Sequence, residues 1–205
     1  MKKNLYRMRF HLALLCLLLL NLCQAQVYQK GLSEVEYKIY TSIEEGLLAP
    51  DSVRYLSLKH KKLKMLPPEI FLFKNLEILD LSKNKLNEIP EDIQKLSKLR
   101  EISLANNQLT TLPIQIGNLT ELRKIIAYQN NIALLPSTMG KLHNLELLDL
   151  WSNEIESFPE EIKSLTSLKY VDLRGIMMSD EHKSKIRSLL PQADIQFSMG
   201  CNCLK

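Results

Sequence analysis

The sequence predicts an α/β solenoid, in which one short strand from each repeat joins a parallel sheet. Three observations lead to this fold class. A frame of 23 residues recurs six times without insertion or deletion, starting at residues 53, 76, 99, 122, 145 and 168, and a fixed period of this length is typical of stacked repeats. Positions 4 and 6 of every frame are apolar, so they point to the same side of a strand. Position 15 is proline in five successive frames, where the chain turns to the far side of the coil (Pro67, Pro90, Pro113, Pro136 and Pro159).

The composition is that of an ordinary folded chain. Hydrophobic residues make up 45% and charged residues 24% of the 205 residues, which excludes a disordered chain, a collagen and a polytopic membrane protein. The formal net charge of +4 resides in the N-terminal segment, because Lys2, Lys3, Arg7 and Arg9 come before the first acid, Glu34. Without these four residues the chain is formally neutral, so we expect no nucleic-acid partner.

Residues 1–25 are predicted to be a signal peptide. The basic residues precede an apolar run, Leu12–Leu20, which is shorter than the ~20 residues of a membrane-spanning helix. Cys23 and Ala25 supply small residues before a cleavage site, so the mature chain would begin at Gln26 and contain no membrane span. Two alternatives stay open, a lipid anchor on Cys23 and an uncleaved N-terminal anchor. All three place the rest of the chain outside the cytoplasm, where it is secreted, periplasmic or on the cell surface.

Within each repeat, the chain must satisfy its backbone polar groups where it leaves the strand. Position 9 is asparagine in the four inner repeats, and an Asn side chain offers both a donor and an acceptor for this purpose. The outer repeats have Lys61 and Ile176 at this position, as expected of terminal repeats with only one neighbour. Apolar residues at positions 18 and 21 are predicted to close the core on the far side of each coil.

The chain resembles the leucine-rich repeat family, in the class with the 23-residue form LxxLxLxxNxLxxLPxxIxxLxx. The resemblance covers residues 53–178, and the repeats that start at Leu76 and Leu99 follow the form almost position by position. It implies a curved, horseshoe-shaped solenoid with a concave parallel sheet of about six strands and turns or short helical segments on the convex side. It further implies binding of a ligand, usually a protein, and no common reaction.

Both ends of such a stack expose apolar core and need a cap. In residues 26–52, Ser42 and Glu45 form a capping box for a short helix that ends before Pro50. In residues 179–198, Ser179 caps a second helix, and an alternating edge strand follows over residues 193–197. One face of this second helix is predicted to cover the core with His182, Ile186, Leu189 and Leu190. The caps resemble those of small secreted bacterial leucine-rich repeat proteins, and residues 199–205 are left as a flexible tail.

The residues predict no catalytic site, no metal site and no cofactor. The 23-residue frame keeps the His residues far apart, and no nucleophile elbow, phosphate-binding glycine loop or zinc-protease motif is present. Asp149 and Asp172 occupy position 5 of adjacent repeats and could form a carboxylate pair, but Arg174 is close enough to neutralise one of them. In the tail, Cys201 or Cys203 could link two chains by a disulfide, or the pair could have no defined role.

The outward positions 3, 5 and 7 of the strands define the concave face. In the C-terminal half these positions gather apolar and aromatic residues with a charged border, and we call this set the C-terminal patch: Ile126, Tyr128, Leu147, Asp149, Trp151, Tyr170, Asp172 and Arg174. Trp151 is the single Trp of the chain, and binding interfaces are enriched in Trp, Tyr and Arg. The alternative is that Tyr128 and Trp151 only cover each other as a cross-strand pair.

These observations predict an exported, non-enzymatic recognition module that binds a protein or peptide partner through the C-terminal patch. The alternative function is a structural or adhesive component of the cell envelope, held by a lipid on Cys23 or by self-association through the same patch. The third hypothesis is that the protein is an enzyme, and a substrate screen that shows no turnover would exclude it.

Overall fold

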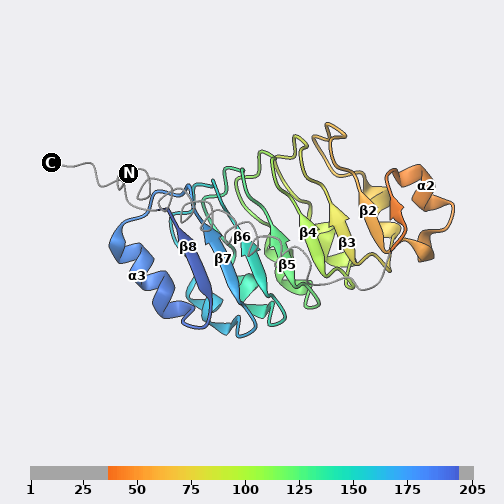
Figure 1. The fold of residues 1–205 in the computed structure, drawn as a ribbon. Coiled ribbons are helices and arrows are strands. Elements are labelled where there is room, and N and C mark those ends of the chain that lie inside the picture. The colour runs from red at the N-terminus through yellow and green to blue at the C-terminus, as the bar shows by residue number, and fades with distance from the viewer. Residues whose placement is uncertain (1–36, 199–205) are drawn as a thin grey trace, which may run out of the picture. The chain divides into compact units, whose positions relative to one another are not determined.

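A computed structural model describes residues 37–198 of the chain. Its strands form a single parallel sheet of eight strands in the order β1 to β8, so each strand pairs with the next one along the chain (Figure 1). The predicted signal peptide over residues 1–25 and the tail cysteines Cys201 and Cys203 lie outside the described residues. The predicted solenoid is therefore confirmed as the fold class: six of the strands come from the repeats, one is the predicted edge strand of the C-terminal cap, and β1 was not predicted.

Six strands come from the six repeats and begin at position 3 of each frame: β2 (Tyr55–Ser57), β3 (Ile78–Asp80), β4 (Glu101–Ser103), β5 (Lys124–Ile126), β6 (Leu147–Asp149) and β7 (Tyr170–Leu173). The register follows the 23-residue period throughout, so that Leu56 lies opposite Leu79 and Ile125 lies opposite Leu148. Equivalent side chains consequently form continuous rows across the sheet.

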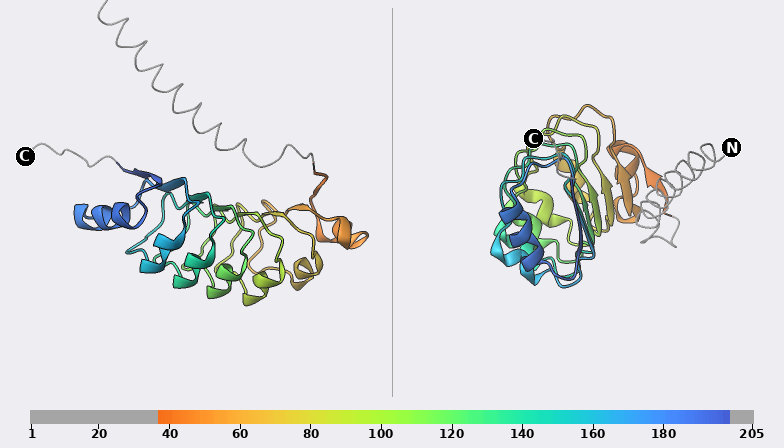
Figure 2. Two further views of the ribbon diagram at one scale, coloured as in Figure 1. Left: turned by 90° about the horizontal axis from the view of Figure 1, so that it is seen from below. Right: turned by 60° about the vertical axis from the view of Figure 1, so that its left-hand side comes forward.

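Short 3₁₀ helices form the opposite side of each coil. They are η2 (Pro68–Leu72), η3 (Glu91–Lys95), η4 (Ile114–Asn118), η5 (Ser137–Lys141) and η6 (Glu160–Ser164), and a further one, η1 (Pro50–Ser52), precedes the first repeat. The position-15 proline is the residue before each of η2 to η6, with φ between −61° and −69°, which is the range that the proline ring imposes. Figure 2 shows these helices along the side away from the strands.

The core lies between the sheet and the 3₁₀ helices. Positions 1, 4 and 6 are buried in all six repeats, and positions 18 and 21 are buried wherever the frame is complete. One contiguous cluster of buried apolar side chains therefore runs the length of the stack. The excess of leucine in the sequence reflects this repeated demand for apolar side chains of similar volume.

The position-9 asparagines form a buried row, the asparagine ladder, as predicted. Each side-chain amide donates to a position-6 carbonyl of its own repeat and to one of the preceding repeat, and its oxygen accepts the position-11 N–H of the preceding repeat. These bonds measure 2.8 to 3.1 Å in every member of the ladder: Asn84, Asn107, Asn130 and Asn153. The ladder thus joins successive repeats by hydrogen bonds in the interior.

The residue before the ladder has a left-handed backbone in every repeat. Position 8 has φ between 54° and 76°, and only Gly175 in the last repeat is a glycine there. A non-glycine residue in this conformation costs about 1 to 2 kcal/mol. The backbone N–H at position 8 donates to a carbonyl of the next repeat, as in Gln129 to Trp151 at 2.8 Å. Gly175 has no repeat after it, and its N–H donates instead to the hydroxyl of Ser198 at 2.6 Å.

The N-terminal cap contains the predicted helix and one unpredicted strand. Helix α2 (Ile43–Leu47) begins after Ser42, whose hydroxyl accepts the Glu45 N–H at 3.1 Å. The Glu45 carboxylate pairs with Lys38 at 3.0 Å and also reaches back to the backbone of Thr41, one residue before the N-cap residue Ser42. Strand β1 (Ile39–Tyr40) pairs with β2. A two-residue strand is too short to produce a recognisable alternation in sequence.

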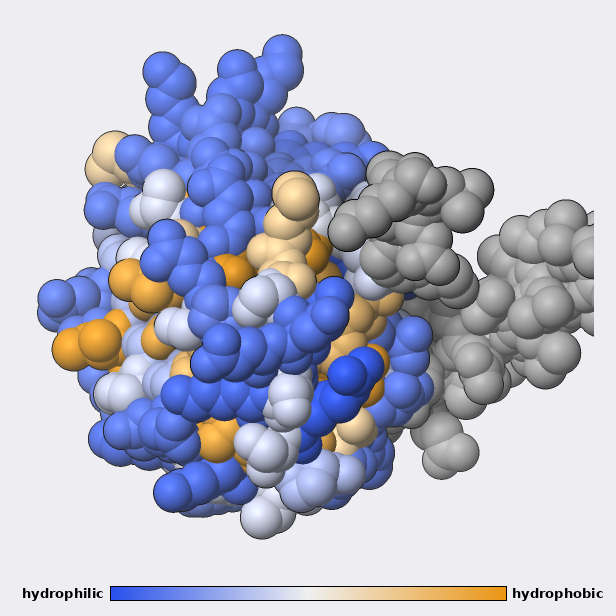
Figure 3. All heavy atoms as spheres, turned by 90° about the vertical axis from the view of Figure 1, so that its left-hand side faces the viewer, coloured by the Kyte–Doolittle hydropathy of each residue, from blue (hydrophilic) through white to orange (hydrophobic). Residues whose placement is uncertain are grey.

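The C-terminal cap consists of helix α3 (Asp180–Leu189) and strand β8 (Asp194–Phe197), both predicted. Ser179 caps the helix by accepting the His182 N–H at 3.2 Å. Ile186, Leu189 and Leu190 are buried, but His182 is exposed, so its predicted place on the buried face was wrong. His182 lies in the first turn of α3, where it and the fully exposed Met177 line a surface hollow. Figure 3 shows a mainly hydrophilic surface with scattered apolar residues at this end of the stack.

Candidate functional site

The sheet has one face against the core and one face directed away from it, and we call the second the open face. It corresponds to the face predicted to be concave. Positions 3 and 5 of the repeats belong to the strands on this face, and position 7 follows where the strand ends. The structure places the C-terminal patch on three neighbouring strands, because Ile126 lies opposite Asp149, Leu147 opposite Tyr170, and Asp149 opposite Asp172.

Trp151 and Tyr128 pack against each other across adjacent repeats. Their ring centroids are 5.7 Å apart and the ring planes are tilted by 48°, a geometry that is favourable for aromatic pairs. Trp151 nevertheless keeps 37% of its surface exposed. A Cβ added to Gly175 would lie 3.3 Å from the indole Nε1, so the backbone of the last repeat approaches the indole closely. The cross-strand pair is real, and it leaves much of the indole available to a ligand.

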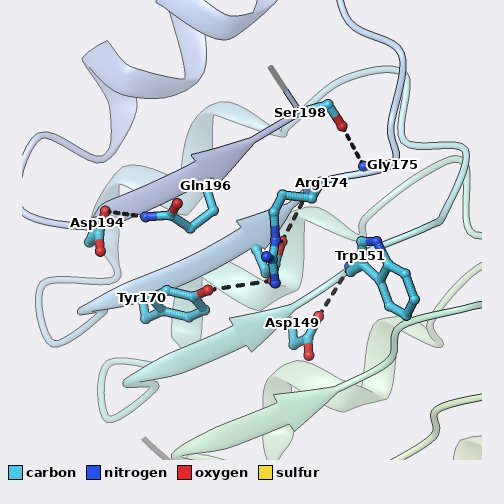
Figure 4. Close-up of polar contacts among 9 residues, drawn as sticks. Asp149, Trp151, Tyr170, Arg174, Gly175, Asp194, Gln196 and Ser198 are labelled. Atoms are coloured by element: carbon cyan, nitrogen blue, oxygen red, sulfur yellow. Dashed lines mark hydrogen bonds and ion pairs between the residues drawn. The ribbon is translucent and has the colours of Figure 1, made fainter. Parts of the chain in front are cut away.

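Asp172 is the buried member of an ion pair with the exposed Arg174. The Asp172 side chain is nearly inaccessible, with 5% exposure, and Arg174 reaches it through Nε at 3.0 Å and through a terminal nitrogen at 2.6 Å. The Tyr170 hydroxyl donates to the same carboxylate at 3.4 Å (Figure 4). Burial, followed by the negative charge of Asp172, raises the pKa of Tyr170 to about 12. The hydrogen bond to Asp172 raises the pKa of Arg174. The predicted neutralisation of one aspartate by Arg174 is therefore seen in the structure.

Asp149 has a different environment from its neighbour. One carboxylate oxygen accepts the backbone N–H of Trp151 at 3.1 Å, and no Lys or Arg of the described residues forms an ion pair with Asp149. Burial, with a smaller contribution from the charge of Asp172, raises the pKa of Asp149 to about 6. Because Asp172 is held by Arg174, the two acids do not share a proton in the manner of a catalytic dyad. The arrangement offers a desolvated carboxylate beside aromatic rings.

Part of the Asp149 environment is a property of the repeat. Asp80 and Asp172 also occupy position 5, and each accepts the N–H of position 7, at 2.9 and 3.0 Å respectively. An aspartate at this position therefore stabilises the turn at the end of the strand. Asp80 also lies 3.5 Å from the hydroxyl of Ser57. Among the described residues, only Asp149 makes this turn, has aromatic neighbours and forms no ion pair.

Strand β8 extends the open face beyond the residues predicted from the sequence. Gln196 lies opposite Asp172 and donates to Asp194 at 2.7 Å, and both side chains appear beside Tyr170 and Arg174 in Figure 4. From the sequence, this strand was predicted only as part of the cap. The alternation of the strand already indicated its outward face. Asp194 and Gln196 are its polar residues, while Ile195 and Phe197 pack against the core.

The N-terminal half of the open face is more polar. Lys124 is buried and pairs with Glu101 at 3.4 Å, and Ser57 and Asp80 are neighbours in the adjacent strands. Next to this face, Glu77 is nearly buried between Arg54 and Arg100, at 3.1 and 2.8 Å. These ion pairs satisfy the charges within the protein. Tyr55 is the aromatic side chain of the repeat strands in this half and is partly exposed, whereas Tyr128, Trp151 and Tyr170 lie together in the C-terminal half.

Neither a metal centre nor a membrane-crossing helix is found in residues 37–198. That part of the chain contains no group of three or more His, Cys, Asp and Glu side chains that could hold a metal ion. None of its helices has the length and apolarity needed to span a bilayer.

Comparison with known proteins agrees with the fold. A family described as "Leucine-rich repeat region" matches residues 51–129, and one described as "Leucine Rich Repeat" matches residues 144–165. No curated protein sequence matches the chain. Proteins built from such repeats are typically binding scaffolds without enzymatic activity.

Two solved structures illustrate the similarity. A leucine-rich repeat protein of Leptospira interrogans is 33% identical, with a TM-score of 0.64 over 80% of this chain. The leucine-rich repeat ectodomain of the Arabidopsis thaliana membrane receptor kinase GASSHO1/SCHENGEN3, solved in complex with CASPARIAN STRIP INTEGRITY FACTOR 2, is 32% identical, with a TM-score of 0.59 over 71% of this chain. The present chain spans 47% of the first protein and 18% of the second. By its repeats, its fold and these matches, the chain belongs to the leucine-rich repeat family.

Proposed function

We propose that this protein is an exported, non-enzymatic recognition module that binds a protein or peptide partner through the C-terminal patch. The observation that carries the proposal is the exposure of Trp151. A large aromatic side chain on an open sheet face adds little to folding, whereas it contributes strongly when a partner covers it. The Arabidopsis ectodomain, which was solved with CASPARIAN STRIP INTEGRITY FACTOR 2 bound, supports protein binding as the general role.

The test of binding is selection of ligands from a random displayed peptide library against the full chain, followed by calorimetry with purified peptides. We expect Trp151→Ala to weaken binding by about 2 kcal/mol, or roughly thirtyfold. The packing against Tyr128 and the contact of the indole with the backbone at Gly175 are lost, so the free energy of unfolding should fall by about 1 kcal/mol. Tyr55→Ala is the matched control, since Tyr55 lies on the open face at the other end of the sheet, and it should leave the affinity unchanged.

Equal affinities for Trp151→Ala and wild type would refute the C-terminal patch as the binding surface. Sedimentation of the purified protein tests the adhesive alternative. Self-association that disappears in Trp151→Ala, with no selected peptide bound, would replace the recognition role by assembly through the same surface.

Export is tested separately, by mass spectrometry of the protein recovered from its native host. A mature chain that begins at Gln26 supports the signal peptide and excludes a lipid on Cys23. A chain that begins at an acylated Cys23 would establish the lipid anchor, and a chain that begins at Met1 would contradict cleavage.

A further inference from the structure

The acids on or beside the open face differ in how their charges are balanced. Four of them have a Lys or Arg partner within 3.4 Å: Glu77, Glu101, Glu146 and Asp172. Asp80, Asp149 and Asp194 have no such partner among the described residues. Asp80 lies near the Ser57 hydroxyl and Asp194 accepts from Gln196, whereas Asp149 lies in the row next to Asp172, beside Trp151. A carboxylate that has lost hydration without gaining a cation is stabilised when a cation is supplied from outside.

Arg174, the nearest cationic side chain of the C-terminal patch, is not free to supply that charge. It donates three side-chain hydrogen bonds to Asp172, at 2.6, 3.0 and 3.1 Å, and its backbone N–H donates to the same carboxylate. Moving it to Asp149 would leave the buried Asp172 without a cationic partner, at a cost in stability. The raised pKa of Asp149 agrees with this incomplete compensation, since burial is its main cause.

The surroundings of Asp149 fit an organic cation better than a small ion. Trp151 follows two residues later and stacks on Tyr128, while Leu147 and Ile126 provide apolar surface on the same strand and on the neighbouring one. Aromatic faces attract ammonium and guanidinium groups, and apolar surface accommodates the methylene chain that carries them. A hydrated metal ion would find a single carboxylate here, because no metal-binding group of three donors occurs within residues 37–198.

We propose that Asp149 anchors a lysine or arginine side chain of the partner, with Trp151 and Tyr128 lying against that side chain. This inference rests on the function proposed above and specifies the chemistry of the ligand. The partner is a protein or peptide segment that presents one basic residue between apolar residues. The basic group pairs with Asp149, and the apolar residues cover Ile126 and Leu147.

The single Trp of the chain reports on this site directly, so intrinsic fluorescence measures binding without a label. The probes are three capped tripeptides, Leu-X-Leu, in which X is arginine, lysine or the neutral arginine analogue citrulline. We expect saturable changes in Trp151 emission with the arginine and lysine peptides and at least tenfold weaker binding of the citrulline peptide. Comparison of the two cationic peptides shows which basic side chain is preferred.

Asp149→Asn should remove this preference, so that all three peptides bind alike. The asparagine keeps an oxygen for the Trp151 N–H, so the turn is retained, and circular dichroism checks the fold. Asp80→Asn is the matched control, because Asp80 makes the same turn with Ser82 at 2.9 Å far from Trp151, and it should bind as wild type does. Equal binding of arginine and citrulline peptides, or an unchanged preference in Asp149→Asn, overturns the inference.

The outcome separates this inference from the proposed function. If peptides from the random library lose affinity in Trp151→Ala but bind Asp149→Asn as well as wild type, the recognition surface stands and the cation anchor is wrong. If neither substitution alters their binding, both proposals are wrong. A basic residue selected in the library by wild type and not by Asp149→Asn supports both.

Discussion

Asn107 of the asparagine ladder offers a direct test of how the repeats are held together. In Asn107→Ala, the Leu86 N–H loses its acceptor, which lies at 3.0 Å, and an unsatisfied buried donor costs about 1 to 3 kcal/mol. The carbonyls of Leu81 and Leu104 lose one donor each, at 3.1 and 2.8 Å. Both keep another, because Asn84 and Asn130 also donate to them. Adding about 0.5 kcal/mol for each of these two bonds, we expect a loss of about 3 kcal/mol in the free energy of unfolding.

Equilibrium denaturation in urea, followed by circular dichroism and by Trp151 fluorescence, measures this loss. Coincident transitions by the two probes establish two-state unfolding, which stacked repeats do not always show. Asn144→Ala is the control, because the Asn144 side chain is exposed and makes one bond, to the Thr120 carbonyl at 2.9 Å. Its loss should stay below about 0.5 kcal/mol. If Asn107→Ala unfolds at the same urea concentration as this control, the buried ladder does not stabilise the stack.

Two further predictions concern stability. Folding raises the pKa of Asp149 to about 6 from 3.8, so the folded state binds the proton more tightly and the ionised carboxylate costs stability above pH 6. Asp149→Asn should therefore be more stable than wild type by up to about 3 kcal/mol at pH 7, with most of the difference lost toward pH 4; an equal difference at both pH values contradicts the shift. A Cβ on Gly117 would overlap the Thr138 carbonyl oxygen of the next repeat, so Gly117→Ala should lose about 2 kcal/mol in urea denaturation. Lys163→Ala, at the same position of a later repeat, should lose almost nothing, and a loss of equal size there would remove the steric explanation.

Most of the fold is readable from the repeats because each structural demand recurs at a fixed position. The leucine rows, the position-15 prolines and the ladder asparagines each serve one purpose, and the structure confirms all three. The ends were harder to predict, since a cap occurs once and has no second copy to reveal its pattern. For this reason β1 was missed and His182 was placed on the wrong side of α3.

The left-handed turn at position 8 illustrates a different limit. Its non-glycine residues, from His60 to Ser152, are all polar but of five different types, and polar residues are equally common at other exposed positions, so no single residue type marks the conformation. Hydrogen bonds to the neighbouring repeat hold it in place, and those bonds exist only once the coils are stacked.

The sequence by itself determined which side chains face the core and which face outward, because a strand alternates its side chains and the 23-residue period repeats that alternation in register. It therefore predicted that the members of the C-terminal patch would be neighbours. Only the tertiary structure decided how their charges are distributed. Arg174 has two aspartates nearby and binds Asp172, so its charge acts on Asp149 only from a distance, and Asp149 is left without an ion pair of its own. Which aspartate Arg174 binds depends on distances, solvent access and the competition between partners, and a repeat pattern contains none of these.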